Sequence, residues 1–275
     1  MTIDLHVHTT ASDGLHTPKE VVKMANAIGL QAISICDHDT VDGLPEAFEA
    51  ARDTGLEVIP GVEISADYRG QEVHILGYFV DHENLPLRDA LACSRDSRRE
   101  RGKAMLAKLE SLGIFLSWDR VQELAGTGSL GRVHIAEALH EAGYVASPQE
   151  AFDRYIGNDR PAYAHRFRIQ AIEAMRLIRG AGGLPTLAHP RDVQGAVPEL
   201  VAGGLVGLEV YYTGYSREMT SHLRALARRH NLLCTGGSDF HGLALLPDHA
   251  LGSVSVPTEC VENLRARERL LHATS

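Results

Sequence analysis

The stretch IDLHVHTTASDG, residues 3–14, begins the chain with an apolar strand that ends in potential metal ligands. Because side chains alternate along a strand, His6 and His8 lie on the same face, where both imidazoles can bind one ion. Asp13 follows in a turn that can fold its carboxylate back over the strand end. A lone His-x-His pair also fits two half-exposed histidines on an edge strand, so the rest of the chain has to decide between the two interpretations.

The same arrangement, an apolar run followed by histidine or a carboxylate, recurs along the chain. These runs precede His38 in CDHD, Glu63 in PGVEIS, His189 in AHP, and Asp239 with His241 in GSDFHG. His74 instead lies within EVHILGYF, which we expect to be a hairpin strand after the turn at residues 68–71. Burying an unpaired group of this kind costs on the order of several kcal/mol, so a strand gains no stability from ending in one. A cluster of metal ions explains all nine groups together.

The segments DLHVHTTASDG, CDHD, PGVEIS, HILGY, AHP and GSDFHG resemble the motif series of the polymerase and histidinol phosphatase superfamily of metal-dependent phosphoesterases. They run from residue 4 to residue 241 in the order of that family. The resemblance implies three divalent ions. The first would be held by His6, His8, Glu63 and Asp239, the second by Glu63, His74 and His189, and the third by Asp13, His38 and His241. Nitrogen and oxygen ligands without sulfur suit manganese, zinc or iron, and manganese is our first choice.

Between these motifs, strands alternate with helices. Seven strands are expected to start near Ile3, Ala32, Val58, Val73, Leu184, Leu208 and Leu232. The pattern predicts an α/β fold, a distorted, largely parallel (β/α)7 barrel similar to a TIM barrel, formed by residues 1–86 and 162–275. Residues 87–161 contain four predicted helices and no strand, which indicates a small inserted helical domain that contributes to substrate binding.

The insertion contains the stretch GSLGRVHIAEAL, in which Arg132 and His134 lie at a helix start, where free N–H groups and the helix dipole favour anions. This stretch resembles the Gly-Arg-Pro-His segment in the nucleotide-phosphatase branch of the family, with Val133 in place of proline. The resemblance implies that Arg132 and His134 bind phosphate. Planar guanidinium groups suit phosphate, although each arginine taken singly also fits a solvated surface charge. Further candidates are Arg160, Arg166 and Arg191.

Catalysis by a covalent nucleophile is not indicated, because no serine or cysteine lies in a nucleophile elbow or a paired Cys-His motif. Clustered divalent ions instead activate water and neutralise phosphoryl charge. We expect His241 to act in catalysis as well as in metal binding. Asp37 and Asp39 are expected to orient imidazoles, and Asp37 is also a candidate general acid for the leaving group.

Composition limits the cellular setting and the partners. Four cysteines without a C-x-x-C pair favour reducing cytosol over a disulfide framework. No apolar stretch approaches the roughly 20 residues that span a bilayer, and a strand begins directly after Met1, so we expect a cytoplasmic protein without a signal peptide or a membrane partner. A net charge of −9 argues against binding duplex nucleic acid. The expected partner is therefore a small phosphorylated substrate, which is a nucleotide or a short oligonucleotide.

The resemblance implies hydrolysis of a phosphomonoester on a small nucleotide, the 3′-phosphate of a nucleoside 3′,5′-bisphosphate, together with 5′-to-3′ trimming of short RNA. One alternative is a histidinol phosphate phosphatase, which would share the metal site but have a different pocket. The other is a noncatalytic metal-binding module, which is disfavoured because all nine ligand positions are intact.

Overall fold

The computed structural model describes residues 2–126 and 128–273, and the chain divides into two compact units. The first comprises Met1–Leu91 and Ile169–Ser275, and the second comprises Ala92–Arg168. Both boundaries lie a few residues later than expected from the sequence. At the first boundary, helix α3 (Leu85–Ser111) continues from one unit into the other without a break that could mark a limit. Each unit has a hydrophobic core of its own.

The first unit is built on an eight-stranded sheet in which seven strands are neighbours in the order β1-β2-β3-β4-β6-β7-β8. These strands are β1 (Ile3–Val7), β2 (Ala32–Ile35), β3 (Glu57–Tyr68), β4 (Gln71–Tyr78), β6 (Leu184–Leu187), β7 (Gly207–Tyr212) and β8 (Leu233–Gly237). A parallel bridge between Val7 and Phe240 joins the end of β1 to the segment after β8, so the sheet nearly closes on itself. The predicted barrel is confirmed, and each predicted strand start lies within two residues of the observed one.

Strand β4 departs from the parallel pattern. It pairs antiparallel with both β3 and β6. The pairs β1–β2, β2–β3, β6–β7 and β7–β8 are parallel. Because β4 runs in the opposite direction, its amino-terminal half lies at the same end of the barrel as the carboxyl ends of the other strands. An additional strand, β5 (Ile169–Gln170), pairs with β3 and was not predicted, since two residues give no periodic signal.

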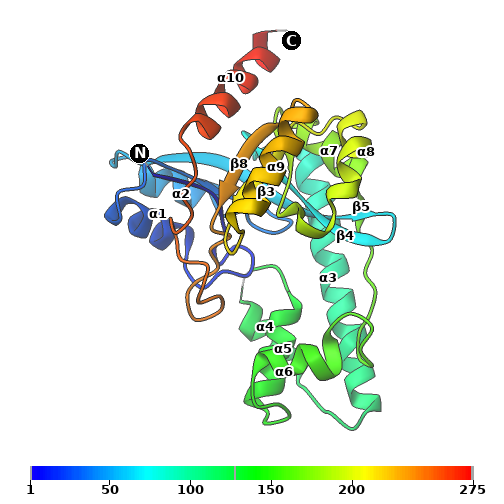
Figure 1. Ribbon diagram of the computed structural model, residues 1–275. Coiled ribbons are helices and arrows are strands. Elements are labelled where there is room, and N and C mark those ends of the chain that lie inside the picture. The colour runs from blue at the N-terminus through cyan, green and yellow to red at the C-terminus, as the bar shows by residue number, and fades with distance from the viewer. Residues whose placement is uncertain (1, 127, 274–275) are drawn as a thin grey trace. The chain divides into compact units, whose positions relative to one another are not determined.

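Helices of the first unit cover this sheet. They are α1 (Pro18–Ala27), α2 (Leu44–Ala51), α7 (Ala171–Gly180), α8 (Val197–Ala202), α9 (Arg217–Arg229) and α10 (Glu259–Ala273), with short 3-10 turns at Pro190–Asp192 and Gln194–Ala196. Thr17 and Glu20 form the capping box expected at the start of α1. Helix α7 packs against β3, β4 and β6, and α9 packs against β7 and β8 (Figure 1). These contacts fix the loops at the carboxyl ends of the strands.

The second unit is helical, and its described residues, 92–126 and 128–168, contain no strand. It comprises most of α3, then α4 (Trp118–Ala125), α5 (Arg132–Glu141) and α6 (Pro148–Ala151), which continues into a π-helical turn, Phe152–Ile156. Ser117 and Ser147 cap α4 and α6 with their side chains, as their sequences predict. Among all described residues, no helix has the length and apolar character that crossing a membrane requires.

Candidate metal centre

The nine predicted metal ligands lie at one end of the barrel. Strand β3 pairs in parallel with β2 only as far as Pro60, so Glu63 lies just past the barrel portion, where β3 continues as a hairpin with β4. His74 faces Ser65 in that hairpin, and the reversed direction of β4 brings His74 to the same end. The remaining ligands follow their strands directly: His6 and His8 at the end of β1, Asp13 in the next turn, His38 after β2, His189 after β6, and Asp239 with His241 after β8.

A first group of donors consists of His6, His8, Glu63 and Asp239. The Nε2 atoms of His6 and His8 are 3.1 Å apart. Oε2 of Glu63 lies 3.4 Å and 3.3 Å from these two nitrogens, and Oδ1 of Asp239 lies 3.4 Å and 3.0 Å from them. Four donor atoms therefore converge on one point, and they belong to the four residues that the family resemblance assigns to one ion.

A second group is built around the other oxygen of Glu63. Its Oε1 lies 3.0 Å from Nδ1 of His74 and 3.3 Å from Nε2 of His189, and these two nitrogens are 3.2 Å apart. Glu63 is 1% exposed. With one oxygen in each group, its carboxylate is placed to bridge two ions.

A third group contains Asp13, His38 and His241, and His8 joins it with its second ring nitrogen. Nε2 of His241 is 3.4 Å from Oδ1 of Asp13. Nδ1 of His38 is 3.0 Å from Oε2 of Glu63, so His38 also contacts the first group, and donor atoms of His38, Glu63 and His74 lie within 4.8 Å of one another. The nine side chains thus form one continuous cluster, in which neighbouring groups share ligands.

Hydrogen bonds fix which ring nitrogen of two histidines faces the cluster. Nδ1 of His6 is 3.0 Å from Oε1 of Glu209, and Nδ1 of His241 is 2.9 Å from the carbonyl oxygen of Asp239. A carbonyl or carboxylate oxygen can only accept, so in both rings Nδ1 carries the proton and donates. The Nε2 lone pairs of both rings then point into the cluster, which is the tautomer that a metal ligand requires.

Two buried polar atoms without hydrogen bonds are a second indication that these donors bind metal ions. Among the described residues, Oδ1 of Asp13 and Nδ1 of His38 are buried atoms without a hydrogen bond, because their contacts with Nε2 of His241 at 3.4 Å and with Oε2 of Glu63 at 3.0 Å do not have hydrogen-bond geometry. An unsatisfied buried polar atom costs about 1–3 kcal/mol, and few remain in native proteins without a reason. Two such atoms within one cluster of convergent lone pairs indicate positions that cations would satisfy.

Charge within the cluster is strongly coupled. Burial lowers the pKa of His8, but Asp239 and Glu63 outweigh burial and raise it to about 10. Burial likewise lowers the pKa of His74, and Glu63 raises it to about 10. In the opposite direction, burial raises the pKa of Glu63, while the surrounding imidazoles, His38 first, hold it well below its usual range. Without metal, His8 and His74 therefore carry protons near neutral pH, and binding of cations at these two rings has to release them.

Glu209 is a functional residue that the sequence prediction missed. It lies in the middle of β7 and is fully buried. Its Oε1 accepts from Nδ1 of His6, and its Oε2 accepts from the backbone N–H of His189 at 2.7 Å. One carboxylate therefore positions ligands of two different groups. A signal for it exists, because the run VGLEVYY places an acidic residue inside an otherwise apolar strand.

We predict that Glu209→Ala lowers metal affinity by about 10–100-fold, the usual cost of losing an outer partner of a metal ligand. The physical reason is that His6 loses the acceptor that fixes its tautomer and His189 loses its backbone anchor. Metal titration followed by calorimetry measures the change, with Glu218→Ala on the exposed start of α9 as the control. Unchanged affinity would remove Glu209 from the support of the site.

Asp37 makes contacts that differ from those expected. Its Oδ1 accepts from the backbone N–H of Thr9 at 2.8 Å and from the hydroxyl of Ser12, and its Oδ2 accepts from the hydroxyl of Thr9 at 2.7 Å. These bonds hold the turn that carries Asp13. The expected role of Asp37 as a general acid gains no support from them. Asp39 likewise accepts from the backbone N–H of Ser65 at 3.0 Å, which ties the loop after β2 to β3.

Arg132 and His134 both lie in the first turn of α5, as expected. Nη1 of Arg132 donates to Oδ1 of Asn158 at 2.9 Å, and its guanidinium lies over the rings of Phe152 and Tyr163. Nδ1 of His134 accepts from the backbone N–H of Gly131 at 3.0 Å, and the ring is buried. These contacts hold both side chains in defined positions within the second unit.

The other arginine candidates differ from one another. Arg191 lies two residues after the ligand His189, where its guanidinium stacks over the ring of Tyr215 and donates to the carbonyl of Gly214 at 3.4 Å. Arg160 is exposed in the turn after the π-helical segment. Arg166 belongs to the last part of the second unit.

Imidazoles and carboxylates grouped around a shared carboxylate at the carboxyl ends of barrel strands define a metal-dependent hydrolase. Residues 4–155 match the PHP domain, and the chain belongs to this family of metal-dependent phosphoesterases. The resemblance of the motif series to this family is thereby confirmed.

Three relatives illustrate the chemistry found in similar proteins. A 5′-3′ exoribonuclease of Haemophilus influenzae is 34% identical, covering 86% of this chain and 89% of its own. A 3′,5′-nucleoside bisphosphate phosphatase of Chromobacterium violaceum is 32% identical over 87% of both chains. A phosphoribosyl 1,2-cyclic phosphate 1,2-diphosphodiesterase of Eggerthella lenta is 34% identical over 87% of this chain and 94% of its own. All three names denote hydrolysis of phosphoric esters, with different substrates.

The fold is also similar to that of a solved structure. A candidate metal-dependent phosphoesterase from Bifidobacterium adolescentis superposes with a TM-score of 0.87 at 33% identity, covering 96% of each chain. Coverage of this extent includes the inserted helices as well as the barrel.

Proposed function

We propose that the protein hydrolyses the phosphate carried by the 3′ oxygen of a nucleotide that also bears a 5′ phosphate. In a nucleoside 3′,5′-bisphosphate this phosphate is a monoester, and at the 5′ end of a short RNA it is the first phosphodiester. The relatives named bisphosphate phosphatase and exoribonuclease support both substrates.

A single reaction covers both cases. Water adds its oxygen to the phosphorus, the bond between the phosphorus and the 3′ oxygen breaks, and the 3′ oxygen leaves with a proton. A nucleoside 5′-monophosphate is released each time. The second product is inorganic phosphate from the bisphosphate and a shortened, 5′-phosphorylated chain from the RNA.

The observation that carries the proposal is the cluster around Glu63. Divalent ions held there would lower the pKa of water toward about 7 and neutralise charge on the phosphoryl oxygens. The residues of the chain supply position. Glu63 joins two donor groups. Glu209 keeps His6 in the tautomer that presents Nε2, and the carbonyl oxygen of Asp239 does the same for His241. Asp13 contributes an oxygen without a hydrogen bond. We propose three ions, manganese first, and a role for His241 in both metal binding and turnover.

We assign the second phosphate of the substrate to Arg132 and His134. The guanidinium of Arg132 is fixed between Asn158 and two aromatic rings, which reduces the entropy that it loses on binding phosphate. Arg160 and Arg191 remain further candidates for phosphate contacts. The four cysteines are free, which fits a reducing compartment, and we place the protein in the cytoplasm, acting on small phosphorylated substrates and not on duplex nucleic acid.

A panel of substrates with manganese tests the proposal. We expect strong turnover of adenosine 3′,5′-bisphosphate and of a 5′-phosphorylated oligoribonucleotide, and little turnover of histidinol phosphate or of a phosphoribosyl 1,2-cyclic phosphate. Turnover confined to either of the last two compounds would contradict the assignment of a nucleotide substrate.

Arg132→Ala should weaken transition-state binding of the bisphosphate by about 2–5 kcal/mol, seen in kcat/KM, because a fixed guanidinium that meets phosphate away from water is lost. p-Nitrophenyl phosphate should lose less, since it lacks the phosphate that is not cleaved. Arg154→Ala is the matched control, because Arg154 pairs with Glu150 on the exposed face of the same unit. Equal losses on both substrates would place Arg132 on the scissile phosphate. No loss on either substrate would indicate that Arg132 is a surface charge without a role in substrate binding.

A further inference from the structure

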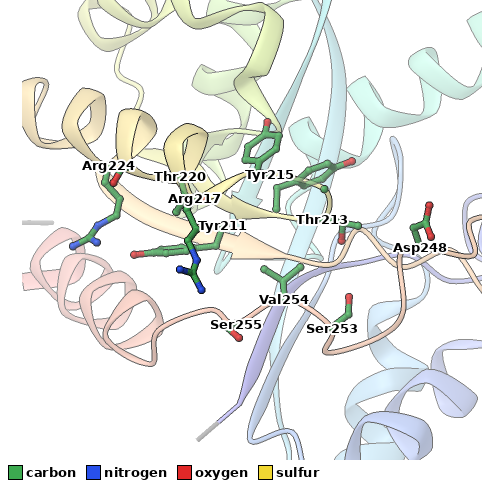
Figure 2. Close-up of a pocket in the computed structure, with 13 residues that line it drawn as sticks. Tyr211, Thr213, Tyr215, Arg217, Thr220, Arg224, Asp248, Ser253, Val254 and Ser255 are labelled. Atoms are coloured by element: carbon green, nitrogen blue, oxygen red, sulfur yellow. The ribbon is translucent and has the colours of Figure 1, made fainter.

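A cavity of about 620 Å³ lies beside the metal centre, between the end of β7, the first turns of α9 and residues 253–255 (Figure 2). The basic side chains that line it are Arg217 and Arg224. A second cavity of about 490 Å³ shares Ser221 and Arg224 with the first and continues along α9 to Arg228. The two cavities meet at these two residues, and we refer to them together as the groove along α9.

The groove has a positive charge in a chain whose net charge is −9. Residues seven and four positions apart lie on nearly the same face of a helix, so Arg217, Arg224 and Arg228 form a row, with spacings of roughly 10 Å and 6 Å along the axis. Within the described part of the chain, none of the three guanidinium groups forms an ion pair or a hydrogen bond. Asp248 is the one carboxylate among the described residues that line the groove, and Figure 2 shows it at the opposite side of the first cavity from Arg224.

One side chain contacts both the groove and a predicted metal ligand. Tyr212 lines the first cavity, and its hydroxyl donates to Oδ2 of Asp239 at 2.8 Å. Its neighbour Thr213 also lines the cavity and donates to the carbonyl oxygen of Ser238 at 2.9 Å. The end of the groove that Tyr212 and Thr213 line therefore adjoins the metal centre.

We propose that the groove along α9 binds the phosphates of an RNA chain on the 3′ side of the bond that is cleaved. Proteins bind single strands through a positively charged groove that follows the backbone and through aromatic rings on which bases stack. The arginine row supplies the charge, and the half-buried ring of Tyr211 lines the first cavity. Hydroxyl groups of Thr220, Ser221, Ser253 and Ser255 add donors for phosphate oxygens. This inference rests on the proposed cleavage of RNA. It assigns to the groove the RNA chain that follows the cleaved phosphate, which a bisphosphate lacks.

The test compares substrates of different length in the Arg217→Gln/Arg224→Gln double variant. The substrates are adenosine 3′,5′-bisphosphate and 5′-phosphorylated oligoribonucleotides of two and eight nucleotides, each measured over a series of salt concentrations. Arg229→Gln is the control, because Arg229 lies on the same helix and lines neither cavity.

For the wild type we expect kcat/KM to rise with length and to fall with salt. The double variant should lose about tenfold or more on the eight-nucleotide RNA, chiefly through KM, with little change on the bisphosphate. Its slope of log kcat/KM against log salt on the long RNA should decrease by about 1.4, because each lost phosphate contact removes about 0.7 from the slope for single strands. Arg229→Gln should retain the length dependence and the slope of the wild type.

Three outcomes would overturn the inference. Equal losses on all three substrates would assign the arginines to the cluster itself, and unchanged activity and salt slope on the long RNA would leave them as solvated charges. In the third outcome, free adenosine 5′-monophosphate inhibits the wild type and Arg229→Gln but not the double variant, while the double variant keeps the length dependence of the wild type. That result would assign the groove to a free nucleotide. Failure of the proposed function is distinguishable, because the wild type would then turn over neither the bisphosphate nor any RNA.

Discussion

Glu63→Gln should lower turnover by well over a hundredfold while the fold persists. The two oxygens of Glu63 lie within 3.4 Å of nitrogens from five imidazoles, those of His6, His8, His38, His74 and His189. Glutamine has the same size, so packing is preserved, but it removes the negative charge and presents an N–H group where lone pairs converge. Loss of a residue that only hydrogen-bonds a metal ligand already lowers metal affinity or activity by about 10–100-fold, so loss of a ligand that two groups share should lower activity further.

Steady-state kinetics with saturating manganese and circular dichroism measure the two parts of this prediction. Glu57→Gln is the matched control, because Glu57 lies on the same strand, β3, and pairs with Arg265 at the other end of it. Near-normal turnover of Glu63→Gln with a full complement of metal would exclude the bridging role.

His38→Ala and His241→Ala should each lower turnover by orders of magnitude and leave the fold largely intact. Both rings face other polar groups, with Nδ1 of His38 beside Glu63 and Nε2 of His241 beside Asp13, so their removal opens no cavity in a packed apolar core. The loss should follow from weaker retention of the ion in the third group.

Thermal unfolding and activity at several metal concentrations check both histidine variants, with His222→Ala, on the exposed face of α9, as the control. Two results would count against the ligand role. One is near-normal turnover at saturating metal, and the other is failure of both variants to fold, since that would identify structural histidines.

Much of the barrel could be predicted because its signals are local. The apolar strand starts and the Thr17 capping box each depend on a few neighbouring residues, and the ligands follow the strands directly. The position of His74 was predicted only through the family resemblance, because its reason is the antiparallel direction of β4, which depends on pairing with β3 and β6. The turn at residues 68–71 does predict the hairpin with β3, whereas the pairing with β6 joins segments that lie far apart in the sequence.

The residues that support the site were harder to predict. Glu209 contacts His6, which lies 203 positions away along the chain, and no spacing pattern connects the two residues. Asp37 was expected near the imidazoles because it precedes His38, but its oxygens accept from Thr9 and Ser12 in a different loop. The row of arginines on α9 does show helical periodicity, yet its position beside the cluster depends on the contact between Tyr212 and Asp239. Such pairings over long distances arise from tertiary packing.

The central claim, that the nine donors hold three ions, is tested most directly by counting metal. Fully metallated and active protein should contain close to three divalent ions per chain by elemental analysis, and strong chelation should remove activity together with the ions. The ligand sharing among the three groups predicts this number. A single ion per chain in a fully active sample would contradict the account.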